Sequence, residues 1–345
     1  MIDLRSDTVT RPTEAMLESM REATYGDDSR DGDETVRRLE ALAAERMGKE
    51  AAAFMPSGTM TNLAAVLTHT ARGGEVLLEA DSHMLNSELG GISAVAGTFY
   101  RPIAGVRGAI DLDRLAENIR IDTRQNFGTA LVCMETSHNK AGGAVLPLEH
   151  MESVYRIARQ HEVPVHTDGA RIFNAALALG TSPDAVARHT DSLSFCISKG
   201  LSAPVGSLLC GGSAYIERAR AFRRMLGGNM RQAGPLAAAG IVALETMVAR
   251  LEQDHATAHR LAQKLNAIDP SLVDPAAVET NIVRVDVRSS GHTAAEWSTK
   301  LRTRGILVSP CASHALRFVT HRHIGEADVD QAVEAFRTLW TDRFR

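Results

Sequence analysis

A lysine lies directly after an apolar run that reads as a buried strand. The run covers residues 192–198, and Lys199 follows it beside Gly200, shortly before Pro204 and Gly206. In open α/β sheets, ligands bind outside the carboxyl ends of the strands. A partly desolvated lysine at such an end can act as a nucleophilic amine that forms a Schiff base. A lysine in a surface loop explains this segment equally well.

A carboxylate, Asp168, ends a second apolar run and is followed by Gly169, Ala170 and Arg171. A buried carboxylate beside a pyridine nitrogen keeps that nitrogen protonated, so the ring becomes an electron sink. Enzymes that use pyridoxal phosphate (PLP) commonly rely on this pairing. One helix and one strand separate Asp168 from Lys199, so both side chains are expected at the same edge of a sheet. Taken alone, Asp168 is better explained as a cap of the helix that follows.

Small residues interrupt a third apolar segment, 52–67, at Ser57, Gly58 and Thr59, just before it resumes as an amphipathic helix. Backbone N–H groups at a helix N-terminus are free to bind a phosphate, although a plain helix cap has the same sequence. His83 follows another apolar run and is placed to stack on a cofactor ring, yet a single histidine is more often structural. We call Ser57, Gly58 and Thr59 the phosphate cup. The order of the cup, then Asp168, then Lys199 along the chain indicates one cofactor site.

The elements that must position these side chains alternate between strands and helices. Strands are expected at 75–80, 130–136, 163–169, 192–198 and 206–211, and helices at 151–162 and 172–180. Such alternation predicts an α/β fold with a mostly parallel sheet and helices on both faces. The strands are apolar throughout rather than at every second residue, which fits burial of both faces.

The pattern changes after Arg231. An Ala-rich helix comes first, followed by helices at 249–268, 293–305 and 326–340 that alternate with strands at 280–287 and 315–321. This predicts a large domain over residues 1–248, including an N-terminal arm, and a small C-terminal α/β domain over residues 249–345.

The composition is that of an ordinary globular protein. Of 345 residues, 44% are hydrophobic and 23% charged, and the formal net charge of −4 argues against a nucleic-acid or polybasic membrane surface. The N-terminus lacks the apolar core of a signal peptide, and Glu245 interrupts the longest apolar stretch, so no membrane span is expected. The four cysteines show neither metal-binding nor disulfide spacing. A reducing, cytoplasmic compartment and no metal site are therefore predicted.

Taken together, these segments resemble the L-threonine aldolases, members of the β-eliminating lyase group of fold-type-I PLP enzymes. The resemblance covers nearly the whole chain and lies in LRSDTVTRPT, PSGTMTN, EADSH, HTDGARIFNAA, SKGLSAPVGS, MLGGNMRQAG and RFVTH. It implies an aspartate-aminotransferase-like fold, PLP as cofactor and a homotetramer with active sites at subunit interfaces. It also implies cleavage of an L-3-hydroxy amino acid, such as L-threonine or L-allo-threonine, to glycine and an aldehyde.

The resemblance implies a role for each matching residue. Lys199 would hold PLP through its amine, Asp168 would pair with the pyridine nitrogen, and His83 would stack on the ring. The phosphate would be bound by four residues, the last from a neighbouring subunit: Ser57, Gly58, Thr59 and Arg231. The carboxylate of the amino acid would be bound by Ser6, Arg171 and Arg317, of which Arg171 also counts as a cofactor-binding residue.

Three positions depart from the family pattern. Arg30 and Ser87 stand where the family usually carries tyrosine, and Gln125 stands where it often carries a histidine that contacts the β-hydroxyl. All three would line the pocket for the substrate side chain, whereas the cofactor residues are intact. Drift in a low-specificity enzyme explains this without a new substrate. The sharper hypothesis is that the substrate has a larger side chain that is polar or acidic, as in 3-hydroxyaspartate, and that this side chain pairs with Arg30.

Other functions fit the same residues less well. A PLP-dependent β-eliminating lyase or an amino-acid racemase would share the cofactor chemistry and differ only in which bond to Cα breaks. A non-catalytic binding module on this fold is opposed by the intact Lys199, Asp168 and His83. A cofactor-free lysine aldolase usually occupies a TIM barrel, which suits neither the phosphate cup nor the C-terminal elements.

Overall fold

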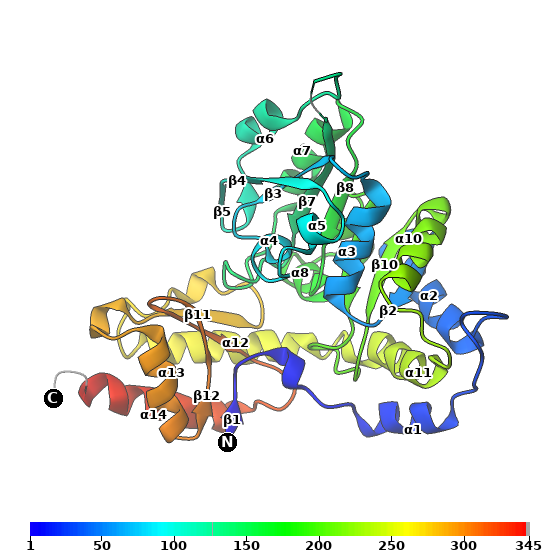
Figure 1. Cartoon of the computed structure of the whole chain (residues 1–345). Coiled ribbons are helices and arrows are strands. Elements are labelled where there is room, and N and C mark those ends of the chain that lie inside the picture. Colours follow the sequence, from blue (N-terminus) through cyan, green and yellow to red (C-terminus); the bar gives the residue numbers. More distant parts are fainter. Residues whose placement is uncertain (126, 343–345) are drawn as a thin grey trace.

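A seven-stranded sheet forms the centre of the molecule (Figure 1). The computed structural model describes residues 1–125 and 127–342. In spatial order the strands are β2 (Ala51–Met55), β10 (Ser207–Gly211), β9 (Ser192–Cys196), β8 (Val165–Asp168), β7 (Thr129–Glu135), β3 (Glu75–Glu79) and β4 (Phe99–Ile103). β10 runs antiparallel to both its neighbours, β2 and β9, so the other strands of this sheet share one direction. Their carboxyl ends therefore meet at one edge.

Helices cover both faces of this sheet, as the uniformly apolar strands predict. Within β2, Ala53 and Met55 pack into a cluster with α3 (Gly58–His69) and α10 (Ser213–Met225). Ala52 and Phe54 point the other way, into the larger cluster that includes α2 (Glu34–Met47). The remaining helices of this part are α4 (His83–Asn86), α5 (Gly91–Ala94), α6 (Leu112–Asn118), α7 (Leu148–Arg159), α8 (Ile172–Ala178) and α9 (Pro183–Ala187).

The C-terminal part has its own sheet and its own core. The antiparallel sheet has the order β11 (Ile282–Asp286), β14 (Ala315–Val319), β13 (Ser309–Ala312). The helices beside it are α12 (Leu251–Asn266), α13 (Ala294–Thr303) and α14 (Glu326–Asp342). Aromatic side chains fill the space between them, with the rings of Trp297 and Phe336 stacked at 4.6 Å. These elements match the tail expected from the sequence.

The N-terminal arm joins the two parts. β1 (Ile2–Asp3) pairs in parallel with β12 (Ile306–Leu307), and Leu4 lies fully buried in the C-terminal core. The arm then continues to α1 (Glu14–Glu22), which packs on α11 (Gly234–Val242) of the large part (Figure 1). The proposed division at residue 248 assigns the whole arm to the large domain, whereas its first residues share a core with the small one.

Most predicted elements between residues 75 and 342 are present within a few residues of their expected bounds. β4 was not predicted, because this edge strand carries Pro102 and two exposed aromatic side chains instead of an apolar run. Among the described residues, no helix has by itself the length and apolar character of a membrane span. The pair Gly234–Met247 and Leu251–Asn266 has them only jointly, across a bend of 65°.

Candidate active site

A recess of about 140 Å³ opens at the edge where the parallel strands end. Its walls come from the N-terminal arm, the loops after β3, β7, β8 and β9, and strand β14 of the small part. Its lining is Ser6, Thr8, His83, Glu135, Ser137, Asn139, Asp168, Ala170, Arg171, Lys199 and Arg317. Lys199, Asp168 and His83 thus come together as the strand order predicts. We call this space the reaction recess.

Asp168 is the last residue of β8 and is almost completely buried. Its Oδ2 accepts a hydrogen bond from Asn62 Nδ2 at 2.9 Å, and its Oδ1 accepts one from the Ala170 N–H at 3.0 Å. The helix that follows begins after Arg171 and has no side-chain cap. Asp168 is therefore held as a fixed carboxylate facing the reaction recess, and the alternative of a helix cap is not what the structure has.

His83 begins the short helix α4 beside Asp168. Its Nδ1 lies 3.2 Å from Glu88 Oε1, and Asn62 Nδ2 donates to the same oxygen at 2.9 Å. The bond to Glu88, with help from the Asp168 charge, raises the pKa of His83 against the opposing effect of burial. Donor and acceptor atoms of His83, Glu88 and Asp168 all lie within 4.8 Å of one another. Glu88 thus fixes the ring, which leaves Nε2 as the nitrogen available to a ligand.

A buried hydrogen-bond chain continues from Asn62 away from the recess. Asn62 Oδ1 accepts from Ser194 Oγ at 2.7 Å and lies 3.3 Å from His166 Nε2. His166 Nδ1 lies 2.9 Å from Ser192 Oγ, which also contacts His69 Nε2 at 2.7 Å. Burial lowers the pKa of His166 to about 4 and that of His69 to about 3, so both rings are neutral. These contacts to Oδ1 hold Asn62 in the orientation in which its Nδ2 donates to the two carboxylates, Asp168 and Glu88.

Arg171 forms a buried ion pair with Asp7 of the N-terminal arm. Its Nε and Nη2 donate to the two carboxylate oxygens, both at 2.7 Å, and Asn281 Nδ2 adds a third contact at 3.2 Å. Burial raises the pKa of Asp7, but the charges of Arg171 and Lys199 outweigh it and hold this pKa well below its usual value. Two nitrogens of Arg171 are thus occupied by Asp7, while its side chain still lines the recess.

Arg317 reaches the recess from β14. Its Nη1 donates to Asn139 Oδ1 at 2.7 Å and its Nη2 to the Arg5 carbonyl at 3.2 Å. Its Nε is buried and has no partner. Buried donors are normally satisfied, so this nitrogen is available to a ligand such as a carboxylate. Burial, together with the nearby charge of Arg171, lowers the pKa of Arg317.

The main chain around Lys199 is fixed by the arm as well. Thr10 Oγ1 donates to the Lys199 carbonyl at 2.7 Å, and the Ser202 N–H donates to it at 2.8 Å. Ser6, one turn earlier in the arm, accepts from the Thr8 N–H and lines the reaction recess.

The residues of the expected phosphate cup lie at the start of α3, after β2. Ser57 caps this helix by accepting from the Met60 N–H at 3.2 Å, and Gly58 and Thr59 follow as its first residues. A Cβ at Gly58 would lie only 2.9 Å from Cys196 Sγ on β9, so the close approach of helix and strand requires glycine here. The three residues are not part of the reaction recess lining.

Arg30 and Arg231 lie on two loops that are hydrogen-bonded to each other, since the Asp28 N–H donates to the Arg231 carbonyl. Their side chains are 78% and 66% exposed, and each lies 3.8 Å from Asp27. Arg30, which was predicted to line the substrate pocket, is not part of the reaction recess lining of its own chain. A role across a subunit interface, as expected for Arg231 on the neighbouring loop, stays a prediction. Arg231 was expected to act on a neighbouring subunit, and its exposure leaves it free to do so.

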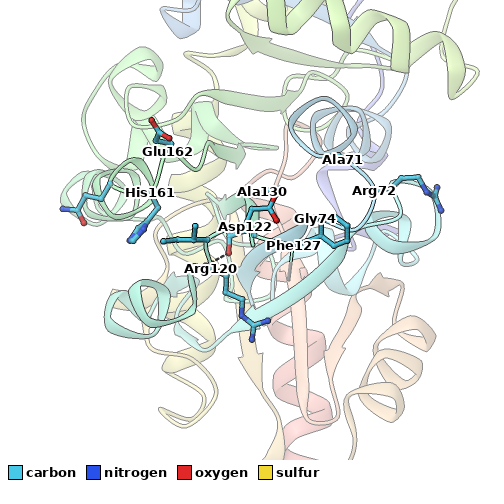
Figure 2. A pocket seen from close by; sticks show the side chains of 13 residues that line it. Ala71, Arg72, Gly74, Arg120, Asp122, Phe127, Ala130, His161 and Glu162 are labelled. Carbon is cyan, nitrogen blue, oxygen red and sulfur yellow. Dashed lines mark hydrogen bonds between the residues drawn. The ribbon is translucent and has the colours of Figure 1, made fainter. Parts of the chain in front are cut away.

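Gln125 was also predicted in the substrate pocket. It does not line the reaction recess of its own chain, so its role stays a prediction. It precedes β7, whose seven residues separate it from the catalytic edge. It lines a surface pocket with Phe99, Tyr100 and Phe127 at the other end of the sheet. Figure 2 shows an adjoining pocket of about 650 Å³ there, around Arg72, Arg120 and Phe127. Ser87, by contrast, lies near the reaction recess, in a second recess described below.

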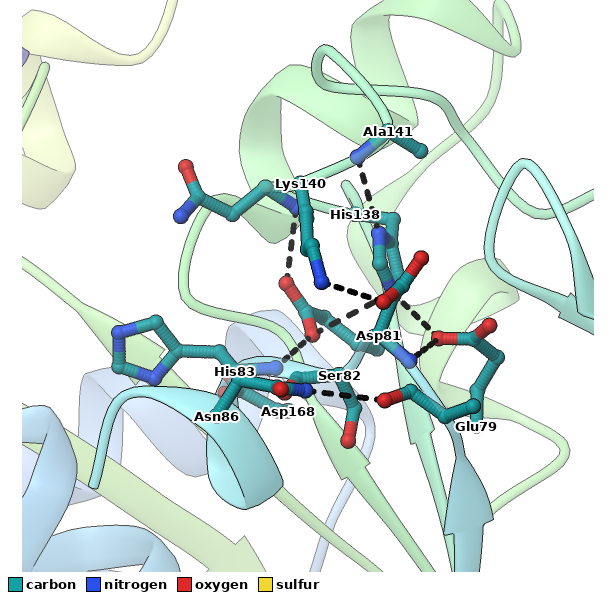
Figure 3. Close-up of polar contacts among 12 residues, drawn as sticks. Glu79, Asp81, Ser82, His83, Asn86, His138, Lys140, Ala141 and Asp168 are labelled. Carbon is teal, nitrogen blue, oxygen red and sulfur yellow. Dashed lines mark hydrogen bonds and ion pairs between the residues drawn. The ribbon is translucent and has the colours of Figure 1, made fainter. Parts of the chain in front are cut away.

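Sequence reasoning missed a group of acidic residues beneath His83, which Figure 3 shows. Glu135 accepts from the His83 N–H at 2.6 Å and from the Asn139 N–H at 2.8 Å. His138 Nε2 lies 3.0 Å from Glu79 Oε2. Burial lowers the pKa of His138, but Glu79 and Glu135 outweigh it and raise this pKa. The sequence did hold a signal for Glu135, because this residue lies at the end of the strand predicted at 130–136. In the structure it pairs directly with Asp168 in the register of β7 and β8.

Comparisons with known proteins show the family of this chain. The sequence model of the β-eliminating lyase family matches residues 3–288. The low-specificity L-threonine aldolase 1 of Arabidopsis thaliana is 43% identical, over 97% of this chain and 95% of that protein. The low specificity L-threonine aldolase of Escherichia coli K12 is 41% identical, over 98% of this chain and 99% of that protein.

Solved structures share the fold. The threonine aldolase of Leishmania major superposes with a TM-score of 0.81 at 18% identity, over 99% of this chain and 100% of that one. A structure of SPT with PLP has a TM-score of 0.79 at 17% identity, over 99% and 88%. The family match spans most of the chain, and two relatives exceed 40% identity over almost its full length. The chain therefore belongs to the β-eliminating lyase family and, within it, to the L-threonine aldolases.

Proposed function

We propose that the chain is a PLP-dependent aldolase that cleaves the Cα–Cβ bond of an L-3-hydroxy amino acid to glycine and an aldehyde. The observation that carries this proposal is the convergence of Lys199, Asp168 and Arg317 on one small recess. An amine for the cofactor, a carboxylate for its ring nitrogen and a cation for the substrate carboxylate are the groups that this reaction needs.

The residues present fit PLP. Lys199 offers the amine, Asp168 a buried carboxylate that Asn62 holds in place, and His83 a ring oriented by Glu88. The start of α3 offers backbone donors for a phosphate, where Gly58 leaves no room for a side chain. PLP bound here supplies the electron sink for the pair released at Cα.

The arginines bind and orient the substrate in this proposal. Arg317 Nε is a buried donor without a protein partner among the described residues, and Arg171, which lines the same recess, is held by Asp7. A carboxylate bound by these arginines fixes the direction of the remaining bonds at Cα. Catalysis then gains from orientation, because the bond that breaks must stand perpendicular to the cofactor ring.

His83 is the group placed to move the proton of the β-hydroxyl. Its Nδ1 is engaged by Glu88, so Nε2 faces the ligand and can take the proton as the aldehyde leaves. The small part closes the recess with Arg317, and the arm closes it with Ser6 and Thr8. Both limit the access of water.

The test is a substrate panel on the purified holoenzyme, which follows glycine release from L-threonine, L-allo-threonine and L-threo-3-hydroxyaspartate. Glycine with an equal amount of aldehyde supports the aldolase. A 2-keto acid with ammonia would instead indicate β-elimination, and the Cα epimer of the substrate, such as D-allo-threonine from L-threonine, would indicate racemisation. If borohydride failed to fix a pyridoxyl group on Lys199, the proposal would be overturned.

The proposal includes a homotetramer with active sites at subunit interfaces, in the cytoplasm. The high exposure of the Arg231 side chain supports a partner that receives it. All four cysteines are unpaired in the structure, which suits a reducing compartment. Light scattering of the pure protein tests the assembly, and loss of PLP affinity in an Arg231→Ala variant tests the contribution across the interface.

A further inference from the structure

A second recess of about 260 Å³ adjoins the reaction recess and shares three of its residues, His83, Asn139 and Arg317. The rest of its lining is Asp81, Asn86, Ser87, Lys140, Pro310 and Cys311. Its walls come from the start of α4, the loop after β7 and strand β13. We call it the side-chain recess.

A lysine and an aspartate at the mouth of this recess pair with each other. Figure 3 shows the Lys140 amine joined to the Asp81 carboxylate, with His83 and Asn86 close by. The two side chains are 45% and 57% exposed. Ion pairs this exposed contribute little to stability and are easily exchanged. Lys140 can therefore leave Asp81 for a ligand carboxylate at low cost.

The shared residues set the direction of the substrate. In the proposed function, the α-carboxylate lies at Arg317 and the β-hydroxyl near His83. Both residues also line the side-chain recess, so the atoms beyond Cβ continue into it. The lining of this recess is mostly polar, with Asn86, Ser87 and Lys140 beside the three shared residues, while Pro310 and Cys311 supply its apolar part. An aliphatic side chain would gain little there, whereas an acidic one would meet an ammonium.

We propose that the side-chain recess receives the substrate beyond Cβ and that Lys140 selects side chains that end in a carboxylate. This inference rests on the proposed function and assigns to Lys140 the role that the sequence suggested for Arg30. For 3-hydroxyaspartate the cleavage balances as glycine plus glyoxylate: the Cα–Cβ electron pair stays on Cα, which takes a proton, and the hydroxyl proton is lost as the aldehyde forms.

The experiment compares Lys140→Met with wild-type holoenzyme on L-threo-3-hydroxyaspartate and L-threonine. A charge-assisted hydrogen bond corresponds to about 10- to 100-fold in affinity. We expect kcat/KM for the acid to fall at least about tenfold, while that for threonine stays within about twofold. Asp81→Asn removes the competing carboxylate and should raise the value for the acid. Lys264→Met, which removes another exposed and ion-paired lysine, is the matched control and should change neither.

Binding gives a second readout that needs no turnover. L-aspartate lacks the hydroxyl and cannot undergo this cleavage, so calorimetry can compare its dissociation constant with that of L-alanine. Lys140→Met should raise the dissociation constant of L-aspartate at least about tenfold and leave that of L-alanine unchanged. A neutral result in both assays overturns the inference, as does a loss of acid selectivity in Arg30→Ala but not in Lys140→Met. Glycine from threonine alone would reject the inference and keep the aldolase; no glycine from any substrate would reject both.

Discussion

The floor of the active-site cleft, around Asp168, and its rim, around Lys140, differ in burial and in how their polar groups are satisfied. On the floor, Asp168, Asn62 and Glu88 are at most 8% exposed and are bound to one another. On the rim, Lys140 and Asp81 face solvent and hold only each other. Removal of one partner leaves a desolvated charge on the floor but only a hydrated one on the rim. Substitutions on the floor should therefore disturb the cofactor site, whereas substitutions on the rim can change the preferred substrate at little cost in stability.

The largest effect is expected at the reactive amine of the floor. Lys199→Ala removes the group that binds the cofactor covalently, so glycine release should fall on the order of a thousandfold or more. The absorbance of the protein-bound cofactor should change in parallel, while circular dichroism stays the same. Lys264→Ala is the control on the far side of the small part. Retention of more than about a tenth of the activity would contradict the central role of Lys199.

The next largest effect concerns the buried ion pair between the arm and the recess. Asp7→Asn leaves Arg171 buried without a counter-charge, which should lower the free energy of unfolding by about 3–5 kcal/mol. Urea unfolding of the holoenzyme measures this. The double variant Asp7→Asn with Arg171→Met should regain most of the loss, because no unpaired charge remains. Equal stability of the single variant and wild type would mean that the pair is not desolvated in solution.

The same pair has a defined pH dependence. The pKa of Asp7 is lower in the folded state than in the unfolded chain, so its contribution is complete above the unfolded pKa, about 3.9. It is lost as the pH falls from there towards the folded value. Wild type should thus lose stability below about pH 4 more steeply than the double variant. Coincident curves would exclude this explanation.

A smaller effect is expected at Asn62, which touches no substrate. Asn62→Leu removes one donor from each of the two carboxylates, Asp168 and Glu88. A hydrogen bond to a charged group corresponds to about 10- to 100-fold in affinity, so PLP affinity should weaken by that order. Titration with PLP, followed by absorbance, measures it. Asn118→Leu, in which the lost bond is on an exposed helix end, should leave the affinity unchanged.

The smallest expected effect is a shift in the pKa of His83, which lies between the floor and the rim. Glu88→Gln removes the charge that raises the pKa of His83, so this pKa should fall. Any limb of the pH–rate profile that belongs to His83 should move to lower pH with it. NMR titration of the histidines tests this directly, with His150 on α7 as an unchanged internal reference. If the pKa of His83 were the same in Glu88→Gln and in wild type, Glu88 would not be the group that raises it.

The contrast between floor and rim also explains what the sequence could predict. The strand ends that carry Asp168 and Lys199 follow apolar runs, and their common edge follows from the parallel order. Asn62, Glu88 and Asp7 went unpredicted, because they have partners that are distant in the sequence, up to 274 residues away, and no local pattern marks such pairs. Family membership, carried by the buried motifs, is confirmed by the comparisons.

The predictions that stay open concern exposed loops. Arg30 and Gln125 were assigned from the resemblance alone, and neither lies at the reaction recess of its own chain. Nothing buried ties their side chains to the strand ends, so the sequence could not reveal where their loops lie. Lys140, whose role is proposed above, carried no signal for the same reason, since a lysine after a turn usually indicates only a solvated surface.

The pairing of β1 with β12 has a consequence for how the protein is made. Ile2 and Asp3 leave the ribosome long before their partners, Ile306 and Leu307. The arm must therefore wait, with Leu4 still in water, until these partners have been made. Only then can Asp7 dock on Arg171 and Thr10 on Lys199. The reaction recess is consequently completed only after β12 has emerged, so a nascent chain that ends before β12 lacks the docked arm.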